Sequence, residues 1–172
     1  MTPRAILLAS LFAAINFWST VGGAAGAEES DTAALAAAMK TAKATLHRAL
    51  IASKAHGAPI SAKFEIEYGK LQLSIYTMKD NDFMKIVINA KTGTISGVEQ
   101  ITDAMDLNQA MEQKAAMAKA NVPLLTAAEA AVNANAGSRA VSIVPELRNG
   151  QATAEVTLLA RSTFKKVTEK LD

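Results

Sequence analysis

Residues 62–68 alternate strictly between apolar and charged side chains, and the charged members are Lys63, Glu65 and Glu67. Because successive side chains of a strand point to opposite faces, this pattern predicts a half-buried β-strand. A two-residue turn at Gly69-Lys70 would pair Ile66 with Leu73 and fix the register of a first hairpin.

The same alternation continues through two further strands. A four-residue turn at residues 79–82 would place Ile75 opposite Ile86. The larger apolar residues then fall on one face, so three antiparallel strands are expected. A third turn at residues 90–93 leads to a short fourth strand at about residues 94–98.

Two alanine-rich segments follow the period of a helix. The first is expected from Thr32 to about Ala55, with Ser30 and Asp31 as N-terminal caps and Gly57 as the stop. The second is expected over residues 102–120 as a connecting helix. Its apolar stripe comprises Ala104, Leu107, Met111, Ala115 and Ala118. We interpret the methionines of this segment as core packing and not as metal ligands.

The chain then repeats its first pattern. A capping box at Thr126-Ala127-Ala128-Glu129 opens a helix that Gly137 ends, and Asn149-Gly150 is a strong hairpin signal. Gly137 stands 80 residues after Gly57, and Gly150 stands 81 residues after Gly69. We therefore interpret the chain as two copies of one helix-and-sheet unit.

This interpretation predicts an α+β fold, in which two repeats of a helix packed on an antiparallel β-sheet are joined by a connecting helix. The expected parts are a signal peptide over residues 1–27, a first unit over 28–101, the connecting helix over 102–121, and a second, truncated unit over 122–172. The strands of the second unit carry few large apolar residues, so the two units are expected to share one core. Pro145 lies in the first strand of the second unit, and because proline lacks an N–H group we expect an edge strand there.

The N-terminal segment has the features of a secretion signal. Arg4 precedes an apolar run from Ala5 to Trp18, which then decays into small and polar residues; a membrane-spanning helix needs about 20 continuous apolar residues. Ala25-Gly26-Ala27 supplies the small residues for cleavage before Glu28. We expect a periplasmic or secreted protein with no stable membrane anchor after cleavage. An uncleaved segment that holds the protein on a membrane is the alternative.

Composition narrows the classes of partner. Without Arg4, 17 basic residues face 16 acidic ones, and a net charge of +1 creates no field that would gather nucleic acid or anionic lipid. The sequence has no cysteine, so stability must come from apolar burial and not from disulfides. This favours a periplasmic location over a harsher extracellular one.

Candidate catalytic and metal-binding residues are few. His47 and His56 are nine residues apart, which places them on opposite sides of one helix. Glu65 and Glu67 are interpreted as part of a solvated strand face, and Asp80-Asn81-Asp82 as a turn and not as a calcium site. We therefore expect no catalytic residue, no metal and no cofactor, and we expect that the protein is not an enzyme.

The segment Asn89-Ala90-Lys91-Thr92-Gly93 resembles a motif of the PepSY module of bacterial secreted and membrane proteins. In that family a strand ends in an acidic residue followed by Ala-x-Thr-Gly, and here asparagine replaces the acidic residue. The resemblance covers about residues 36–99, and a weaker copy without the Thr-Gly turn covers about residues 122–172. It implies a small α+β fold with one helix on an antiparallel sheet, and a role in holding secreted peptidases inactive or assisting their folding.

These observations predict an exported interaction module without catalysis of its own. The expected partner is another exported protein, most concretely a peptidase that is acted on in trans. The alternative is a structural or ligand-sensing periplasmic accessory protein with no connection to proteases. Tyr76, Met78 and Phe83 share the sheet face away from the helix of the first unit, where they either pack against the helix of residues 102–120 or form the partner surface. Internal packing is favoured, because exposed apolar patches are costly to keep soluble.

Overall fold

The computed structural model describes residues 25–172, and for residues 25–30 it describes the backbone alone. Most of the predicted signal sequence, residues 1–24, lies outside the described residues. The helices are α1 (Ala25–Met39), α2 (Leu46–Ser53), the short 3-10 helix η1 (Lys54–His56), α3 (Ala104–Met117) and α4 (Leu124–Ala134). The strands are β1 (Ala58–Glu67), β2 (Lys70–Lys79), β3 (Asp82–Asn89), β4 (Ile95–Gln100), β5 (Arg139–Arg148), β6 (Gln151–Ala160) and β7 (Thr163–Lys170).

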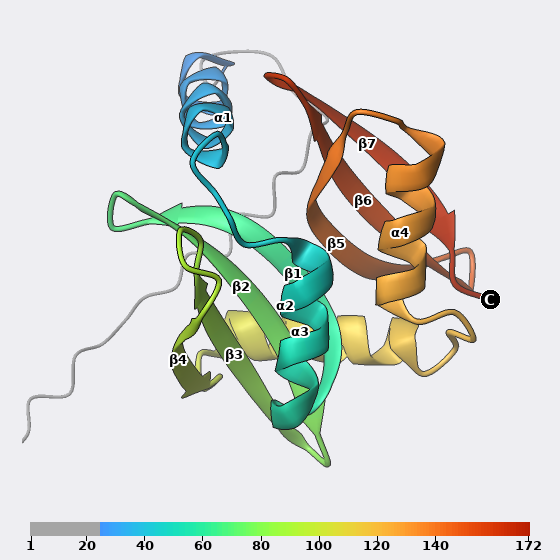
Figure 1. The fold of residues 1–172 in the computed structure, drawn as a ribbon. Coiled ribbons are helices and arrows are strands. Elements are labelled where there is room, and N and C mark those ends of the chain that lie inside the picture. The colour runs from blue at the N-terminus through green and yellow to red at the C-terminus, as the bar shows by residue number, and fades with distance from the viewer. Residues whose placement is uncertain (1–24) are drawn as a thin grey trace, which may run out of the picture.

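All seven strands belong to one antiparallel sheet in the order β4-β3-β2-β1-β5-β6-β7. β1 and β5 meet in the middle, so the meander that follows α2 continues into the meander that follows α4 (Figure 1). α2 and α4 cover one face of the sheet, and α3 crosses the other face (Figure 1). The predicted α+β class is confirmed, and no helix within residues 25–172 is long and apolar enough to span a membrane.

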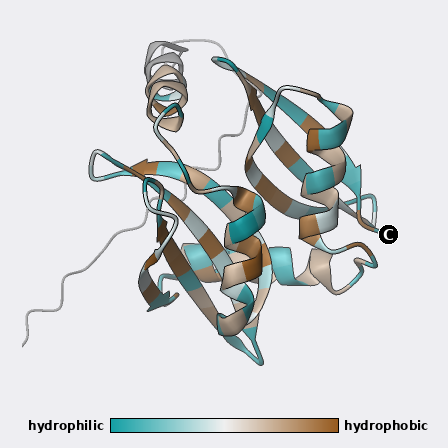
Figure 2. Ribbon diagram, viewed as in Figure 1, coloured by the Kyte–Doolittle hydropathy of each residue, from teal (hydrophilic) through white to brown (hydrophobic). Residues whose placement is uncertain are grey.

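One hydrophobic core lies between the sheet and helices α2 and α4. It joins side chains from both halves of the chain, among them Leu50 and Phe64 from the first and Ala131 and Val156 from the second, all almost fully buried. Figure 2 shows hydrophobic segments alternating with polar ones along the strands, as the two-residue period of a strand requires. The two halves therefore bury their apolar surface together.

The register of the first hairpin differs from the expectation by two residues. Ile66 pairs with Leu71 and not with Leu73, because the turn is Tyr68-Gly69 and not Gly69-Lys70. Tyr68 and Gly69 have φ values of 49° and 71°, the left-handed pair that a two-residue turn of matching twist requires. A shift of two residues leaves every side chain on its predicted face. The expected pairing of Ile75 with Ile86 is confirmed.

The single helix predicted over residues 32–55 is wrong, because residues 40–45 interrupt it. The amides of Lys43 and Ala44 both donate to the buried carbonyl of Ala90, each at 2.9 Å. Thr45 then caps α2 by accepting from the amide of Arg48 at 3.3 Å. Tertiary hydrogen bonds thus override the helical propensity of the alanine-rich sequence.

Arg139 fixes the interrupted segment from the second half of the chain. Its guanidinium donates to the carbonyls of Met39 at 3.1 Å, Ala42 at 3.4 Å and Ala44 at 2.9 Å. The same group lies 5.5 Å from the centre of the Phe64 ring, within the range of a cation–π contact. Burial lowers the pKa of Arg139 from its ordinary value, but an arginine remains charged at any physiological pH.

The ends of α3 and α4 differ from the predicted caps. α3 is capped by Asp103, and not by Thr102, through its contacts with the amides of Met105 and Asp106. α4 begins at Leu124 with Pro123 as N-cap, so Thr126 lies inside the helix and forms no capping box. The earlier start brings Leu124 into the core, where only 3% of its surface is exposed.

The prediction that Pro145 lies in an edge strand is also wrong, because β5 lies between β1 and β6. The pairing of β5 with β1 involves only Ser142 and Ile143. Pro145 lies outside this short ladder, so its missing N–H group is tolerated in a central strand.

We expect that replacing Arg139 by alanine lowers the free energy of unfolding by about 2–4 kcal/mol, because three carbonyls lose a charged donor. Arg139→Lys is the matched control, since it keeps the charge but cannot reach three acceptors with a planar fork. It should recover less than half of the loss. Urea denaturation followed by circular dichroism measures both, and an alanine variant as stable as the original would contradict the prediction.

Candidate functional site

A network of charged and polar side chains lies on the face of the first meander opposite to α2. β1 contributes Glu65, whose carboxylate contacts the ammonium groups of Lys63 at 2.7 Å and Lys85 at 3.4 Å. Lys85, from β3, also contacts Glu67 at 3.0 Å. β2 completes the network, because the Ser74 hydroxyl donates to Glu65 at 2.6 Å. The Gln72 amide donates to Glu65 at 3.3 Å and also to Glu67.

This network is more buried than the sequence predicts. Only 8% of the Lys85 side chain and about a fifth of the Glu65 and Glu67 side chains are exposed, so the interpretation as a solvated face is wrong. The network becomes visible in the sequence only when the three strands are aligned by their register, which brings Gln72, Ser74 and Lys85 onto one face. Each strand alone carries an ordinary alternating pattern.

The charges of the network hold one another ionised. Burial alone would raise the pKa of Glu65, but Lys63, Ser74 and Lys85 outweigh it and the pKa lies below its ordinary value. Burial would likewise lower the pKa of Lys85, but Glu65 and Glu67 outweigh it and the pKa is raised. A carboxylate held ionised by partners is a weak base and cannot act as an acid near neutral pH. The arrangement suits structure or recognition rather than proton transfer.

A small hydrophobic cluster lies beside the network beneath α3. Its buried members are Ile60, Tyr76, Phe83, Ile101 and Ala110, and Met78, Leu107 and Met117 pack against them. Tyr76 is 2% exposed and Phe83 is 6% exposed. Lys114 of α3 lies 6.0 Å from the centre of the Phe83 ring. The three residues considered as a partner surface thus lie under or beside the connecting helix, which is the internal role favoured from the sequence.

α3 covers this cluster with a face other than the predicted one. The buried positions are Asp106, Ala110, Gln113 and Ala116, whereas Met111 is 51% exposed. Gln113 accepts a hydrogen bond of 2.7 Å from the hydroxyl of Ser61 in β1. Of the predicted stripe only Leu107 packs against the cluster, whereas Ala104, Met111, Ala115 and Ala118 are exposed, so the stripe is wrong apart from Leu107. Polar contacts with the sheet contribute to the observed rotation of the helix.

Asp106 is a buried carboxylate of α3 on this face of the sheet. It is 5% exposed, and its Oδ1 atom has no hydrogen-bond partner among the described residues. Burial raises the pKa of the Asp106 carboxyl, and the nearby Asp103 raises it further. Burial, together with Glu65 and Asp106, also raises the pKa of the Tyr76 hydroxyl.

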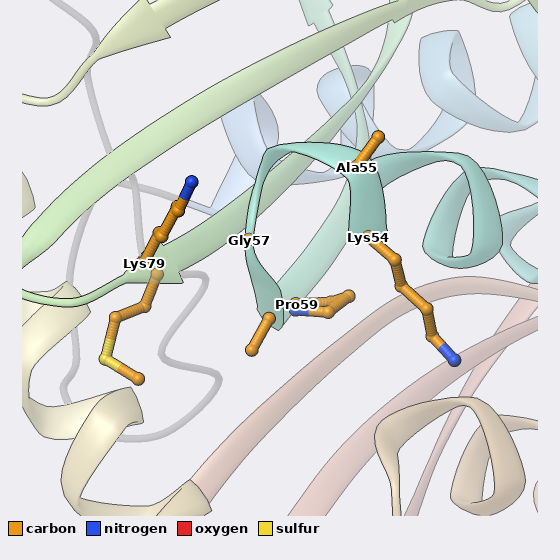
Figure 3. Close-up of a pocket in the computed structure, with 7 residues that line it drawn as sticks. Lys54, Ala55, Gly57, Pro59 and Lys79 are labelled. Carbon is orange, nitrogen blue, oxygen red and sulfur yellow. The ribbon is translucent and has the colours of Figure 1, made fainter.

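A shallow depression opens at one end of this cluster, where η1 meets β1 and β2 (Figure 3). Met78 and Pro59 form apolar parts of its lining, and Lys54 and Lys79 contribute the charged side chains. Gly57 is required here, since a side chain at this position would come within 2.7 Å of the carbonyl oxygen of Met78 and its φ is +133°. Of the three candidate partner-binding residues, Met78 is the one that reaches this surface.

The remaining candidates for chemistry occupy separate places. His47 contacts Glu129 of α4 at 2.9 Å, and His56 lies in η1. Within the Asp80-Asn81-Asp82 turn, Asp80 has a φ of 57° and Asn81 accepts a hydrogen bond from Lys114 at 3.3 Å. Among the side chains that the structure describes, those of residues 31–172, no group of three or more histidine, cysteine or acidic residues is placed to hold a metal ion.

Comparison with known proteins finds one family match. Residues 32–99 match the PepSY family, described as "Peptidase propeptide and YPEB domain", which confirms the resemblance for the first unit; the match does not extend to residues 122–172. No curated protein matches the chain. A solved chain described as a candidate lipoprotein from Clostridium difficile 630 shares 15% identity with a TM-score of 0.42, over 76% of this chain and 88% of that chain.

Replacing Phe83 by aspartate tests the role of the cluster beneath α3. Because Phe83 is buried, a charge there should lower the melting temperature by roughly 10 °C. Met111→Asp is the matched control, since it places the same charge on the exposed side of α3 and should change the melting temperature by no more than about 2 °C. A Phe83→Asp protein that melts like the control would show that the cluster does not stabilise the fold.

Asp106 should make stability depend on pH. Its pKa is higher in the folded protein than its ordinary value of 3.8, so the folded state binds this proton more tightly than the unfolded chain does. The resulting stabilisation is complete below pH 3.8 and is lost as the pH rises through the raised pKa.

An Asp106→Asn variant does not titrate at this position. The difference in melting temperature, variant minus original, should therefore shift in favour of the variant between pH 3 and pH 7. Scanning calorimetry at four or five pH values measures the difference. A constant difference over this range would show that the carboxyl of Asp106 titrates as it does in the unfolded chain.

Proposed function

We propose that this protein is an exported accessory module that binds a secreted or periplasmic peptidase in trans and holds it inactive or assists its folding. The observation that carries the proposal is the match of residues 32–99 to a family described by peptidase propeptides. A propeptide-type module acts by covering its partner, and it needs complementary surface rather than reactive groups of its own. The proposed module accordingly acts without catalysis.

The electrostatics of the candidate site support binding rather than chemistry. Glu65 and Lys85 neutralise each other within a half-buried network. Such a network keeps the sheet face rigid, and a rigid surface loses little conformational entropy when a partner binds. Rigidity of this kind favours a stoichiometric binding module.

We also infer that the two halves of the chain are copies of one unit. The carbonyl of Ala90 accepts the amides of Lys43 and Ala44, and the carbonyl of Leu171, 81 positions later, accepts the amides of Asn121 and Val122 at 2.6 and 2.9 Å. Both acceptor residues are fully buried. In each half this bond pair ties the segment before the helix to the end of the third strand.

The hairpins of the two halves support the same inference. Tyr68 and Asn149 occupy equivalent left-handed turn positions, with φ values of 49° and 51°. Asp80 and Arg161 both have a φ of 57° at the next turn. An irregularity in strand pairing follows Pro59 in β1 and Ala140 in β5, again at corresponding places. Shared positions of strained backbone are better explained by duplication than by chance.

A ligand-sensing accessory role without any peptidase is the second candidate. The depression beside Gly57 favours it, because a lining that combines apolar residues with Lys54 and Lys79 suits a small amphipathic anion. This role predicts that a small molecule, and no peptidase, accompanies the protein.

Affinity capture from the envelope fraction of the source cells separates the two candidates. We expect an exported peptidase to co-purify, and its hydrolysis rate to fall in proportion to added protein or its refolding yield to rise. Thermally unfolded protein serves as the control, because an unfolded chain slows a peptidase merely as a competing substrate. Capture without any peptidase, or equal inhibition by folded and unfolded protein, would contradict the proposed function.

A further inference from the structure

β7 forms an edge of the sheet at which the backbone pairing is regular. Its neighbour is β6, and the two strands pair without interruption from Thr153–Lys170 to Ala160–Thr163. No other strand within residues 25–172 pairs with β7. The opposite edge strand, β4, is shorter and contains an irregularity in its pairing with β3. Irregular and short edges resist the addition of a strand, whereas a regular edge of eight residues offers a template for one.

One backbone hydrogen bond shows which groups of β7 point away from the sheet. The amide of Leu171 donates to the carbonyl of Ala152 at 2.9 Å, so Leu171 faces β6. In an antiparallel ladder residues alternate in this respect. The N–H and C=O groups of Val167 therefore point toward β6, whereas those of Lys166 and Thr168 point outward.

The first half of the protein shows what fits such an edge. β3 follows its turn at Asp80 as β7 follows its turn at Arg161, and β4 covers the outer edge of β3. There Lys85 pairs with Glu99, and Ile86 pairs with Val98. β4, the strand that occupies this edge, is antiparallel to β3. It places a carboxylate opposite a lysine and a branched apolar residue opposite the position after that lysine.

The corresponding positions of β7 repeat this combination of residues. Ile75 pairs with Ile86 in the first half and Val156 pairs with Val167 in the second, so Val167 corresponds to Ile86 and Lys166 to Lys85. β7 also carries net positive charge, because it contains Lys165, Lys166 and Lys170 and the single carboxylate Glu169. Lys166 already contacts Glu155 of β6 at 2.7 Å, so a partner's carboxylate would join this ion pair. Lysines on an edge strand discourage pairing with a second copy of the same edge. The same charges favour an acidic strand.

We propose that the outer edge of β7 binds an extended segment of the exported partner as an added antiparallel strand, with a carboxylate opposite Lys166 and an apolar side chain opposite Val167. The backbone bonds supply affinity and the alternating side chains supply selectivity, as in other cases of strand addition. This inference names the docking surface for the proposed peptidase partner and in that respect rests on the proposed function. The edge itself is tested without any peptidase.

The probe is a synthetic peptide that copies residues 94–101, Thr-Ile-Ser-Gly-Val-Glu-Gln-Ile, added to the full-length protein. Hydrogen exchange followed by NMR should show slower exchange at the outward amides of Lys166, Thr168 and Lys170. Affinity should fall with added salt, because the charged contacts lie at the surface. A peptide with lysine in place of Glu99 should bind more weakly.

Two changes to the backbone test whether the peptide binds as a strand. Thr168→Pro removes an outward N–H group and no bond to β6, so it should weaken binding roughly five- to tenfold while the melting temperature changes little. Thr168→Ala is the matched control, since it loses the contact of the Thr168 hydroxyl with Arg148 but keeps the N–H group. Methylation of the peptide nitrogen at Glu99 should have the same effect as the proline and leaves the protein unchanged.

Unaltered exchange at β7 with the peptide in millimolar excess would overturn the proposal, as would equal affinity for the original and N-methylated peptides. Exchange at β7 that is already slow without peptide, and becomes slower as the protein concentration rises, would also overturn it, because the edge would then pair with a second copy. The envelope capture experiment separates this inference from the proposed function. If a peptidase co-purifies equally well with the Thr168→Pro variant, the proposed function holds and β7 is not the docking surface. If the peptide binds at β7 but no peptidase co-purifies, the edge binds a strand and the proposed function fails.

Discussion

The fold of the first half depends on one buried carbonyl group. The oxygen of Ala90 accepts the amides of both Lys43 and Ala44, and this pair of bonds stops an alanine-rich helix where nothing in its own sequence would stop it. α2 can then begin at Leu46 and lie across β1 and β2 instead of continuing the axis of α1. The core between α2 and the sheet forms because the chain bends at this point, and Arg139 of the second half fixes the bend from the other side.

This constraint also explains the motif on which the family resemblance rests. The Asn89 side chain accepts the amides of Lys91 at 2.9 Å and Thr92 at 3.2 Å. An acidic side chain at the same place could accept both, so asparagine preserves the turn. Gly93 has a φ of +77°, which other residues rarely adopt. The motif therefore holds a turn that presents the Ala90 carbonyl, and its residues are structural rather than catalytic.

Sequence reasoning found the elements that local patterns determine and missed those that distant contacts determine. The faces of β1, β2 and β3 follow from alternation, since each strand repeats with a period of two. The break before α2 could not be found in this way, because its cause lies in Ala90 and Arg139, which are about 50 and 100 residues away in the chain. The rotation of α3 was missed for a related reason. The helix buries Asp106 and Gln113, and a search for apolar stripes discards the polar contacts that orient it.

The register of the first hairpin depends both on local alternation and on contacts with a helix that lies far away in the sequence. A turn at either Tyr68-Gly69 or Gly69-Lys70 keeps the apolar residues on one face, so alternation cannot choose between them. The predicted register would place Lys63 opposite Tyr76, beneath α3, where a cation would lose its water. The observed register places Ser61 there, and its hydroxyl binds Gln113. The helix that covers the sheet thus favours the turn with a left-handed tyrosine, because a lysine buried beneath α3 would cost more than a strained φ at one residue.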